Sequence, residues 1–397
     1  MAAGPRVAIL SAVRTPIGKY GGLLRGVPAV RLGALAAEAA LARSGVAPEA
    51  IPDVVFGQCL QAGAGQNPAR QVLRAVGIPD HAGAVTVNMV CGSGMRALLV
   101  ASAMIRAGDV PLVLVGGMES MSSAPFLVPA AARWGLKPGS APLEDEMMRD
   151  SLLDAYGEHE AMGMSGERIG SRLGLTRTDV DAFAVRSHRL AAQANGDGTF
   201  RPEMVPIPAE IGLKEAMERD EGPRGDSTLE NLARLRPSFL PGGLLTAGNS
   251  SQLSDGAAAL VLASEGEAQR LGRTPLGFLH SHAVGGVHPS DVMEAPIPTV
   301  RQHLSAVGVQ PSEIDRVEYN EAFASSSIAV QRAFGFTDQQ FNVHGGAVAL
   351  GHPIGASGAR IVVTLLHELV RSRGRLGLAT LCMGGGNGLS LLVERAP

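Results

Sequence analysis

Two of the three cysteines in this 397-residue chain lie in glycine-rich turns that suit a nucleophile. Cys91 follows the apolar residues 85–90 and precedes a Gly-Ser-Gly sequence, after which the composition becomes helical. This pattern predicts a strand-to-helix turn, where unpaired backbone N–H groups and the helix dipole stabilise a thiolate. Cys382 lies in a second such turn, before glycines 384–386. Inert buried cysteines are common, so the turn alone leaves a structural Cys91 as an equal alternative.

A histidine and an asparagine occupy comparable positions. His352 lies between a glycine and a proline in the glycine-rich stretch 342–358, just before an apolar helix pattern. A lone histidine is more often a core residue, but a turn that fixes its ring suits a general base or an oxyanion donor. Asn320 directly follows a predicted strand, where a helix N-cap is the simpler alternative. Ligands of α/β sheets bind at the carboxyl ends of strands, where all four residues are predicted.

Alternating strand and helix patterns must position these residues. Up to about residue 117 they predict an α/β fold with a mostly parallel sheet covered on both faces. Residues 122 to about 249 are richer in methionine, proline and charge, and include a predicted amphipathic helix at 177–194. We interpret this segment as an insertion that covers the site. From residue 277 the first pattern recurs, so the two ends of the chain look like duplicated units.

Composition excludes several classes of function. Hydrophobic residues make up 45% and charged residues 18% of the chain, and the net charge of −3 without a basic run argues against nucleic-acid binding. We find no apolar run of the roughly 18 residues that a membrane span needs. Three scattered cysteines predict neither a disulfide scaffold nor a four-cysteine zinc site. We therefore expect a cytoplasmic enzyme of two or three domains.

Several motifs occur in an order that resembles the thiolase family, the coenzyme A-dependent acyl transferases that make or break 3-ketoacyl thioesters. They are residues 11–18, the Cys91 turn, residues 116–122, 236–239, 246–251 and 255–258, and the Cys382 turn. The resemblance implies a duplicated five-layered α-β-α-β-α arrangement of two mixed sheets with an inserted loop domain. The implied N-terminal half comprises residues 1–121 and 249–275, the loop domain 122–248, and the C-terminal half 276–397.

The resemblance also implies a role for each residue. Cys91 would form an acyl-enzyme after His352 takes its proton. Cys382 would be the second acid/base, acting on the methyl carbon of acetyl-CoA. His352 and a water held by Asn320 would form one oxyanion hole, and the backbone N–H groups of Cys91 and Gly384 a second. The implied activity is ping-pong: Claisen condensation of two acetyl-CoA to acetoacetyl-CoA, or thiolysis of 3-ketoacyl-CoA, without a metal or redox cofactor.

Further positions would hold coenzyme A and the acyl group. The resemblance places Arg224 near the phosphates and Ser251 near the pantetheine, with a solvated loop charge as the alternative for Arg224. Ordinary core is the alternative for the residues implied to line the tunnel, which are Met162, Phe239, Met293 and Phe323. The chain departs from the family pattern at Ala161, where histidine is frequent, at Glu294-Ala295, and at His344, where asparagine is frequent. A homodimer or homotetramer is implied.

Other functions fit less well. A ketoacyl synthase or hydroxymethylglutaryl synthase would use a different partner set around the cysteine, and a longer-chain degradative thiolase differs only in its acyl group. A dinucleotide oxidoreductase lacks its Gly-x-Gly-x-x-Gly signal here. A catalytically silent lipid-binding relative remains an alternative. His280 and His282 could belong to a metal site, but such an i, i+2 pair is more often one face of a strand.

Overall fold

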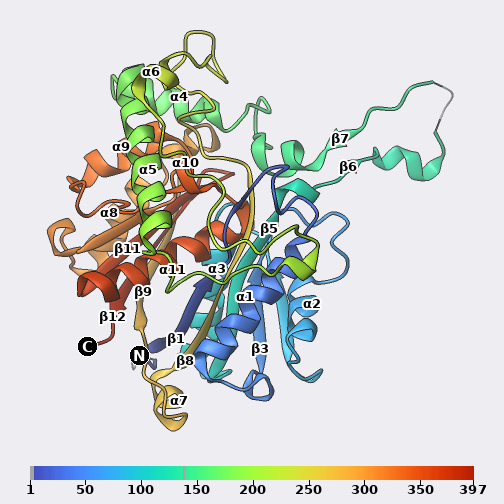
Figure 1. The fold of residues 1–397 in the computed structure, drawn as a ribbon, viewed down its shortest axis with the longest axis vertical. Coiled ribbons are helices and arrows are strands. Elements are labelled where there is room, and N and C mark those ends of the chain that lie inside the picture. Colours follow the sequence, from blue (N-terminus) through green and yellow to red (C-terminus); the bar gives the residue numbers. More distant parts are fainter. Residues whose placement is uncertain (1–3, 137–138) are drawn as a thin grey trace.

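A mixed sheet forms the frame of the protein, seen in the computed structural model over residues 4–136 and 139–397 (Figure 1). Residues 1–3 and 137–138, which fall in the predicted N-terminal half and loop domain, lie outside this description. Strands of the N-terminal half run in the order β4 (Gly83–Val87), β3 (Asp53–Gly57), β5 (Leu112–Ser120), β8 (Ser254–Ser264) and β1 (Val7–Arg14). They continue through β9 (Gly277–Gly286), β12 (Asn387–Arg395), β11 (Leu376–Met383) and β10 (Arg316–Tyr319).

The two halves have the same mixed pairing. β3 is parallel to β4 and β5, and β10 is parallel to β11, whereas β8 and β12 are antiparallel to their neighbours. The short β2 (Gly18–Lys19) adds to β8. Residues Val7 to Ile9 of β1 pair with β9, so the two expected sheets are hydrogen-bonded into one ten-stranded sheet in the described residues. Only three residue pairs join them.

The helices lie in three layers, one between the two halves of the sheet and one on each outer face. Together with the two halves of the sheet they form the expected five layers. α3 (Ser93–Ala107) and α11 (Ile354–Ser372) pack against each other between the halves, in an apolar core shared by both. Their backbones approach so closely at Gly94 that a Cβ there would lie 2.8 Å from the Ala359 nitrogen. α1 (Ala29–Ser44) and α2 (Pro68–Ala75) cover the outer face of the N-terminal half. α8 (Pro296–Val307) and α9 (Ala324–Phe334) cover the other outer face.

Residues 90–107 are long and apolar enough to cross a membrane by length and composition. This corrects our expectation that no such stretch exists. The stretch contains α3, which lies in the middle layer and is mostly buried there, as a core helix is.

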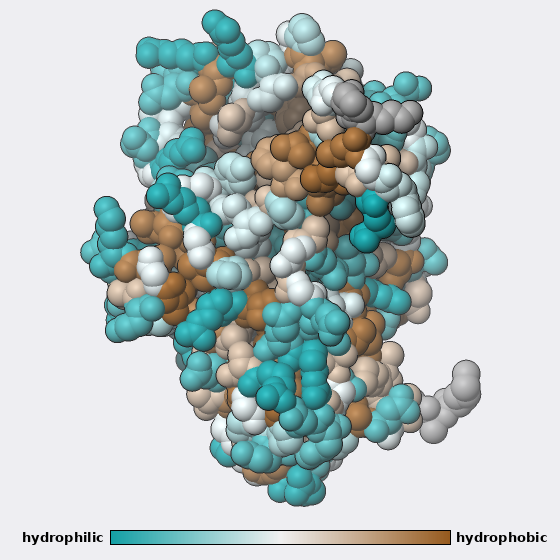
Figure 2. Space-filling view, turned by 90° about the vertical axis from the view of Figure 1, so that its right-hand side faces the viewer, coloured by the Kyte–Doolittle hydropathy of each residue, from teal (hydrophilic) through white to brown (hydrophobic). Residues whose placement is uncertain are grey.

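The segment between β5 and β8 folds over the C-terminal half (Figure 1). It contains α4 (Gly163–Arg172), α5 (Arg177–Asp197) and α6 (Leu229–Ala233), and α5 extends the predicted helix by three residues. An arm with the two-stranded pair β6 (Phe126–Leu127) and β7 (Glu144–Asp145) projects from the body. Figure 2 shows apolar surface around this arm, where Phe126, Trp134 and Leu143 are exposed. Shorter elements are α7 (Glu265–Arg270), α10 (Ala347–Leu350) and the 3₁₀ helix η6 (Pro289–Glu294).

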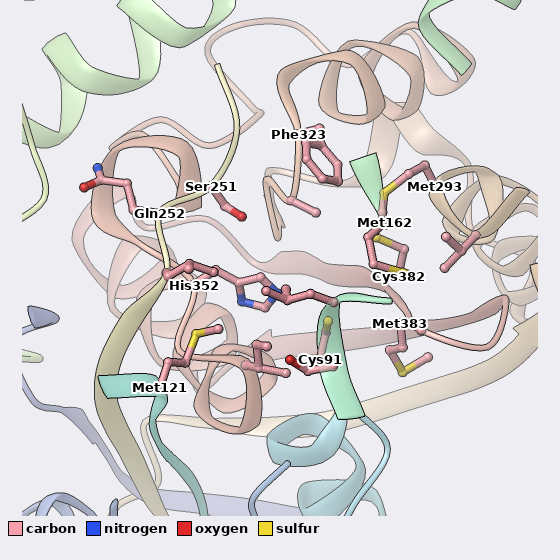
Figure 3. A pocket seen from close by; sticks show the side chains of 17 residues that line it. Cys91, Met121, Met162, Ser251, Gln252, Met293, Phe323, His352, Cys382 and Met383 are labelled. Atoms are coloured by element: carbon pink, nitrogen blue, oxygen red, sulfur yellow. The ribbon is translucent and has the colours of Figure 1, made fainter. Parts of the chain in front are cut away.

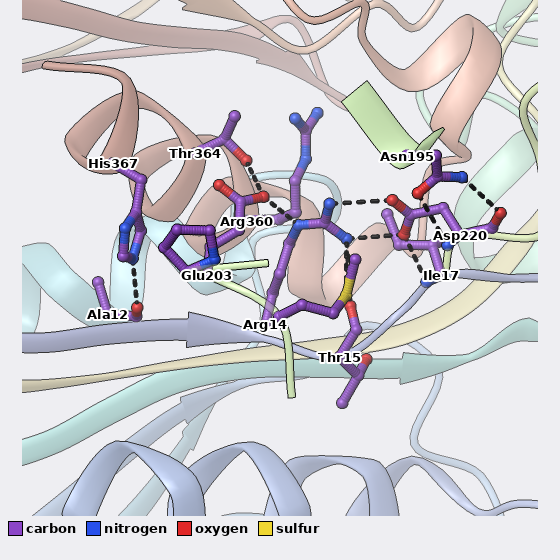
Figure 4. Close-up of polar contacts among 12 residues, drawn as sticks. Ala12, Arg14, Thr15, Ile17, Asn195, Glu203, Asp220, Arg360, Thr364 and His367 are labelled. Carbon is purple, nitrogen blue, oxygen red and sulfur yellow. Dashed lines mark hydrogen bonds and ion pairs between the residues drawn. The ribbon is translucent and has the colours of Figure 1, made fainter. Parts of the chain in front are cut away.

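A buried ion-pair network fastens this segment to the sheet (Figure 4). Arg14, at the end of β1, donates two hydrogen bonds to Asp220, at 2.7 and 2.9 Å, and another to Glu203. Thr364 of α11 also donates to Glu203, at 3.0 Å. All three charged side chains are buried, so each depends on its partners for stabilisation.

Candidate active site

A small apolar cavity brings most of the predicted site residues together (Figure 3). Its volume is about 60 Å³, far below the roughly 300–1,000 Å³ of sites that enclose a drug-sized ligand. Such a space suits a short acyl group and the end of a carrier. The predicted residues that line it are Cys91, Met162, Ser251, Met293, Phe323, His352, Cys382 and Gly384.

Cys91 lies in a strained turn directly before α3. The helix begins at Ser93, whose hydroxyl accepts a hydrogen bond from the Met89 nitrogen and donates to the Val90 carbonyl. Val90 has a φ of 49°, a conformation that is rare for a β-branched residue and typical of functional sites. A Cβ on Gly92 would lie 2.0 Å from the Met383 sulfur, so a larger residue there would displace the Met383 side chain on the Cys382 strand.

Burial of the Cys91 sulfur opposes the thiolate that the helix N-terminus favours. Cys91 is partly exposed to the cavity, but protein surrounds it elsewhere, and this burial raises its pKa to about 12. The neighbouring Cys382 also raises the pKa, whereas the backbone N–H groups of Gly384 and of Cys91 itself lower it. Burial outweighs the dipole. Both predicted oxyanion donors nevertheless converge on the sulfur.

His352 is buried and oriented from both sides. Its backbone nitrogen donates to the Gln252 carbonyl at 2.8 Å, and its Nδ1 lies 2.6 Å from the Ser357 hydroxyl. The same hydroxyl lies 2.9 Å from the Pro353 carbonyl, and when it donates there it accepts from Nδ1–H. In this arrangement Nε2 is unprotonated and can accept a proton. Burial, with a smaller contribution from Arg360, lowers the His352 pKa to about 3, which keeps the ring neutral.

Asn320 lies just behind the cavity, at the end of β10. Its side chain is fully buried, and its Nδ2 lies 3.3 Å from the His352 Nε2. Its Oδ1 has no hydrogen-bond partner among the residues that the structure describes, although buried polar atoms are usually satisfied. An unpartnered buried oxygen beside the imidazole is a suitable anchor for a bound water, which is the role the resemblance implies.

Cys382 faces Cys91 from the end of β11. Burial raises its pKa to about 11, against the opposing effect of the Tyr319 hydroxyl. The Sγ atom lies 3.5 Å from the Met293 sulfur and 3.9 Å from the Tyr319 oxygen. Neither Tyr319 nor Ser357 is among the residues predicted from the sequence. Tyr319 directly precedes Asn320, and Ser357 lies about one helical turn after His352. These positions are the signals in the sequence that could have identified them.

Two predicted contact residues lie away from the cavity. Phe239 is half-buried outside the cavity. Its ring packs edge-on against that of Phe323, which lines the cavity, with ring centroids 5.7 Å apart. Arg224 is exposed on the loop after α5, and its backbone nitrogen donates to the His188 Nδ1 at 3.2 Å. The structure thus places Phe239 as support for the wall and Arg224 outside the cavity.

The departures from the family pattern form contacts of their own. Glu294 and Asp291 both pair with Arg172 at the end of α4, the latter at 2.8 Å. His344 lies 2.9 Å from Glu368 on α11. His280 and His282 lie on β9, and no group of three or more potential metal ligands occurs in the part of the chain that the structure describes.

Comparisons with known proteins agree across the full length of the chain. Models of the thiolase N-terminal and C-terminal domains match residues 7–266 and 273–395. An acetyl-CoA acetyltransferase from Cupriavidus necator is 46% identical over 391 residues, which cover 98% of this chain and 99% of that one. The crystal structure of the Bacillus anthracis acetyl-CoA acetyltransferase has a TM-score of 0.95, 38% identity and full coverage of both chains. Human mitochondrial 3-ketoacyl-CoA thiolase in complex with CoA also has a TM-score of 0.95 and 38% identity, covering 99% of this chain and 98% of that one.

Proposed function

The chain belongs to the thiolase family and is an acyltransferase, and on that premise we propose that it condenses two acetyl-CoA to acetoacetyl-CoA and cleaves short 3-ketoacyl-CoA. The observation that carries the proposal is the convergence of Cys91, His352 and Cys382 on one small apolar cavity. Each supplies a group that acyl exchange requires: a nucleophile, a base and a second acid/base.

In the first half-reaction His352 activates Cys91. Nε2 takes the Cys91 proton, and the resulting thiolate attacks the thioester carbonyl carbon. The bond from that carbon to the coenzyme A sulfur breaks, and the leaving thiolate takes the proton back from Nε2. Because Cys91 has a high pKa and His352 a low one, the proton moves only as the sulfur attacks.

In the second half-reaction Cys382 acts on the incoming acetyl-CoA. Cys382 first gives its thiol proton to the His352 Nε2, and the resulting thiolate removes a methyl proton from acetyl-CoA. The carbanion attacks the carbonyl of acyl-Cys91 and a carbon–carbon bond forms. Cys91 leaves as a thiolate and takes the proton from the His352 Nε2, so that all three groups return to their resting forms. The N–H groups of Cys91 and Gly384 stabilise the oxyanion, and losing one such donor typically costs about 2.7–4 kcal/mol of barrier. These groups balance both steps, so we propose no resident cofactor.

The cavity also supports a preference for short acyl groups. Its walls include Leu152, Met162, Val292 and Met293, and a volume of about 60 Å³ leaves little room beyond the acetoacetyl unit. Longer 3-ketoacyl groups would have to displace these side chains. The pantetheine would lie beside Ser251 and Phe323, which line the cavity. The phosphates of coenzyme A would lie near Arg224, which is exposed on its loop.

We further propose a homodimer or homotetramer. Strand β4 ends the described order of the sheet and carries the exposed Val85, and unpaired edge strands are usually covered. The arm offers a second apolar surface (Figure 2), and Trp134 on this arm is 86% exposed.

A thiolysis series tests the function. The purified protein is mixed with coenzyme A and 3-ketoacyl-CoA substrates of four, six, eight and twelve carbons, and kcat/KM is measured for each. We expect the highest value for acetoacetyl-CoA. A maximum at eight carbons or more would support a degradative thiolase of longer chains instead. No turnover of any substrate would support a silent relative.

A further inference from the structure

Tyr319 is a buried phenol that none of the roles above uses. It is the last residue of β10, its side chain is fully buried, and its ring stacks on Phe341 with centroids 6.0 Å apart. The hydroxyl reaches into the site from behind, 3.9 Å from the Cys382 sulfur. Buried tyrosine hydroxyls normally find a hydrogen-bond partner, and this one has two to choose from.

The first partner is Ser326 on α9, whose hydroxyl lies beside that of Tyr319. With its own proton on the Phe323 carbonyl at 2.9 Å, the Ser326 oxygen is free to accept from Tyr319. The second partner is the Cys382 sulfur. As a thiol, Cys382 donates to the Met293 sulfur at 3.5 Å and needs no donor. As a thiolate it becomes the stronger acceptor, because hydrogen bonds to charged groups are about twice as strong as neutral ones.

We propose that Tyr319 is a positioning residue for the second half-reaction, whose hydroxyl turns from Ser326 to Cys382 and donates to the sulfur when that sulfur loses its proton. The proposal rests on the proposed function, because it takes Cys382 as the acid/base of that step. The 3.9 Å separation is long for the thiol and shortens when the sulfur is charged. The hydroxyl thereby offsets part of the burial that opposes a thiolate.

Few other groups near Cys382 could stabilise or destabilise its thiolate. Across the cavity it faces Cys91, which is neutral at rest, and the neutral ring of His352. From η6 it meets the uncharged Met293. The nearby charges are paired elsewhere: Asp291 and Glu294 with Arg172, and Glu321, which faces Tyr319, with Ser187 and Asn342.

The two half-reactions separate the role of the hydroxyl from the packing of the ring. Tyr319→Phe keeps the ring and removes only the hydroxyl. Acetyl-enzyme is isolated, mixed with acetyl-CoA, and followed for acetoacetyl-CoA in a single turnover across pH. We expect the pH of half-maximal rate to rise by about one unit or more, and the rate at neutral pH to fall about tenfold, because a hydrogen bond to a charged group is lost. Formation of acetyl-Cys91 should be unchanged.

Two further variants extend the test: one should shift the pH of half-maximal rate in the opposite direction, and the other is a packing control. Ser326→Ala removes the competing acceptor, so the pH of half-maximal rate should fall rather than rise. Phe341→Leu disturbs the packing of the same ring without touching the hydroxyl, and should leave that pH in place. An unshifted profile in Tyr319→Phe, or an equal loss in both half-reactions, would overturn the proposal. Failure of the unaltered protein to form acetyl-Cys91 would instead refute the proposed function itself.

Discussion

Replacing Ser357 with alanine should slow acylation of Cys91 without changing the cavity. Ser357 is fully buried in the first turn of α11, and its hydroxyl is the only described partner of the His352 Nδ1. With alanine, the Nδ1–H group is left buried and unsatisfied. The ring can avoid this by moving its proton to Nε2, but Nε2 then cannot accept the proton of Cys91. Both outcomes raise the barrier of the first half-reaction.

The magnitude follows from the cost of that unsatisfied donor. A buried donor without its partner costs about 1–3 kcal/mol, which corresponds to a rate factor of roughly 5 to 150. The assay is the pre-steady-state burst of coenzyme A released when enzyme meets acetyl-CoA. Ser357→Thr keeps the hydroxyl and should retain most of the rate. Ser372→Ala is the matched control, since Ser372 makes the same bond to the carbonyl four residues earlier in α11, at 2.8 Å, but away from the site. An unchanged burst in Ser357→Ala, or an equal loss in Ser372→Ala, would refute the assignment of the His352 tautomer.

Three further outcomes are expected. Because burial lowers the His352 pKa to about 3, the acylation burst should stay level from pH 8 down to pH 5, whereas a decline centred near pH 6.5 would indicate an ordinary solvated histidine. Asp220→Ala leaves the buried Arg14 without its two-bond partner and should lower the free energy of unfolding by about 3–5 kcal/mol in urea titrations; a loss below 1 kcal/mol would show that the network contributes little. Gly94→Ala places a Cβ 2.8 Å from the Ala359 nitrogen and should cost about 1–3 kcal/mol of stability, so an unchanged melting temperature would mean that α3 and α11 can separate freely.

Local patterns were sufficient to predict the frame of the protein. Strand and helix periodicity predicted the alternating strands and helices of the sheet and the helix at 177–194, because such patterns depend on neighbours along the chain. The glycines around Cys91 and His352 likewise marked turns. Both turns pack closely against neighbouring side chains. A Cβ on Gly92 would lie 2.0 Å from the Met383 sulfur, and a Cβ on Gly351 would lie 2.1 Å from the Ser254 hydroxyl.

Features set by distant residues were not predictable in this way. The resting state of Cys91 depends on burial by elements from both halves, which outweighs the helix N-terminus that the sequence reveals. Tyr319 meets Cys382 across 63 residues, and Arg14 meets Asp220 across 206, so neither partnership leaves a local pattern. The joining of the two sheets through β1 and β9 is likewise a contact of the folded chain alone.

The most direct test of the central claim is to locate the acyl group on the enzyme. The Cys382→Ala variant is treated with acetyl-CoA, quenched, digested and analysed by mass spectrometry, with Cys91→Ser in parallel. Acyl exchange through Cys91 predicts an acetyl adduct on the Cys91 peptide of Cys382→Ala, no adduct in Cys91→Ser, and no condensation by either variant. An adduct on Cys382 in Cys91→Ser, or condensation that persists without Cys382, would contradict the assignment of nucleophile and acid/base.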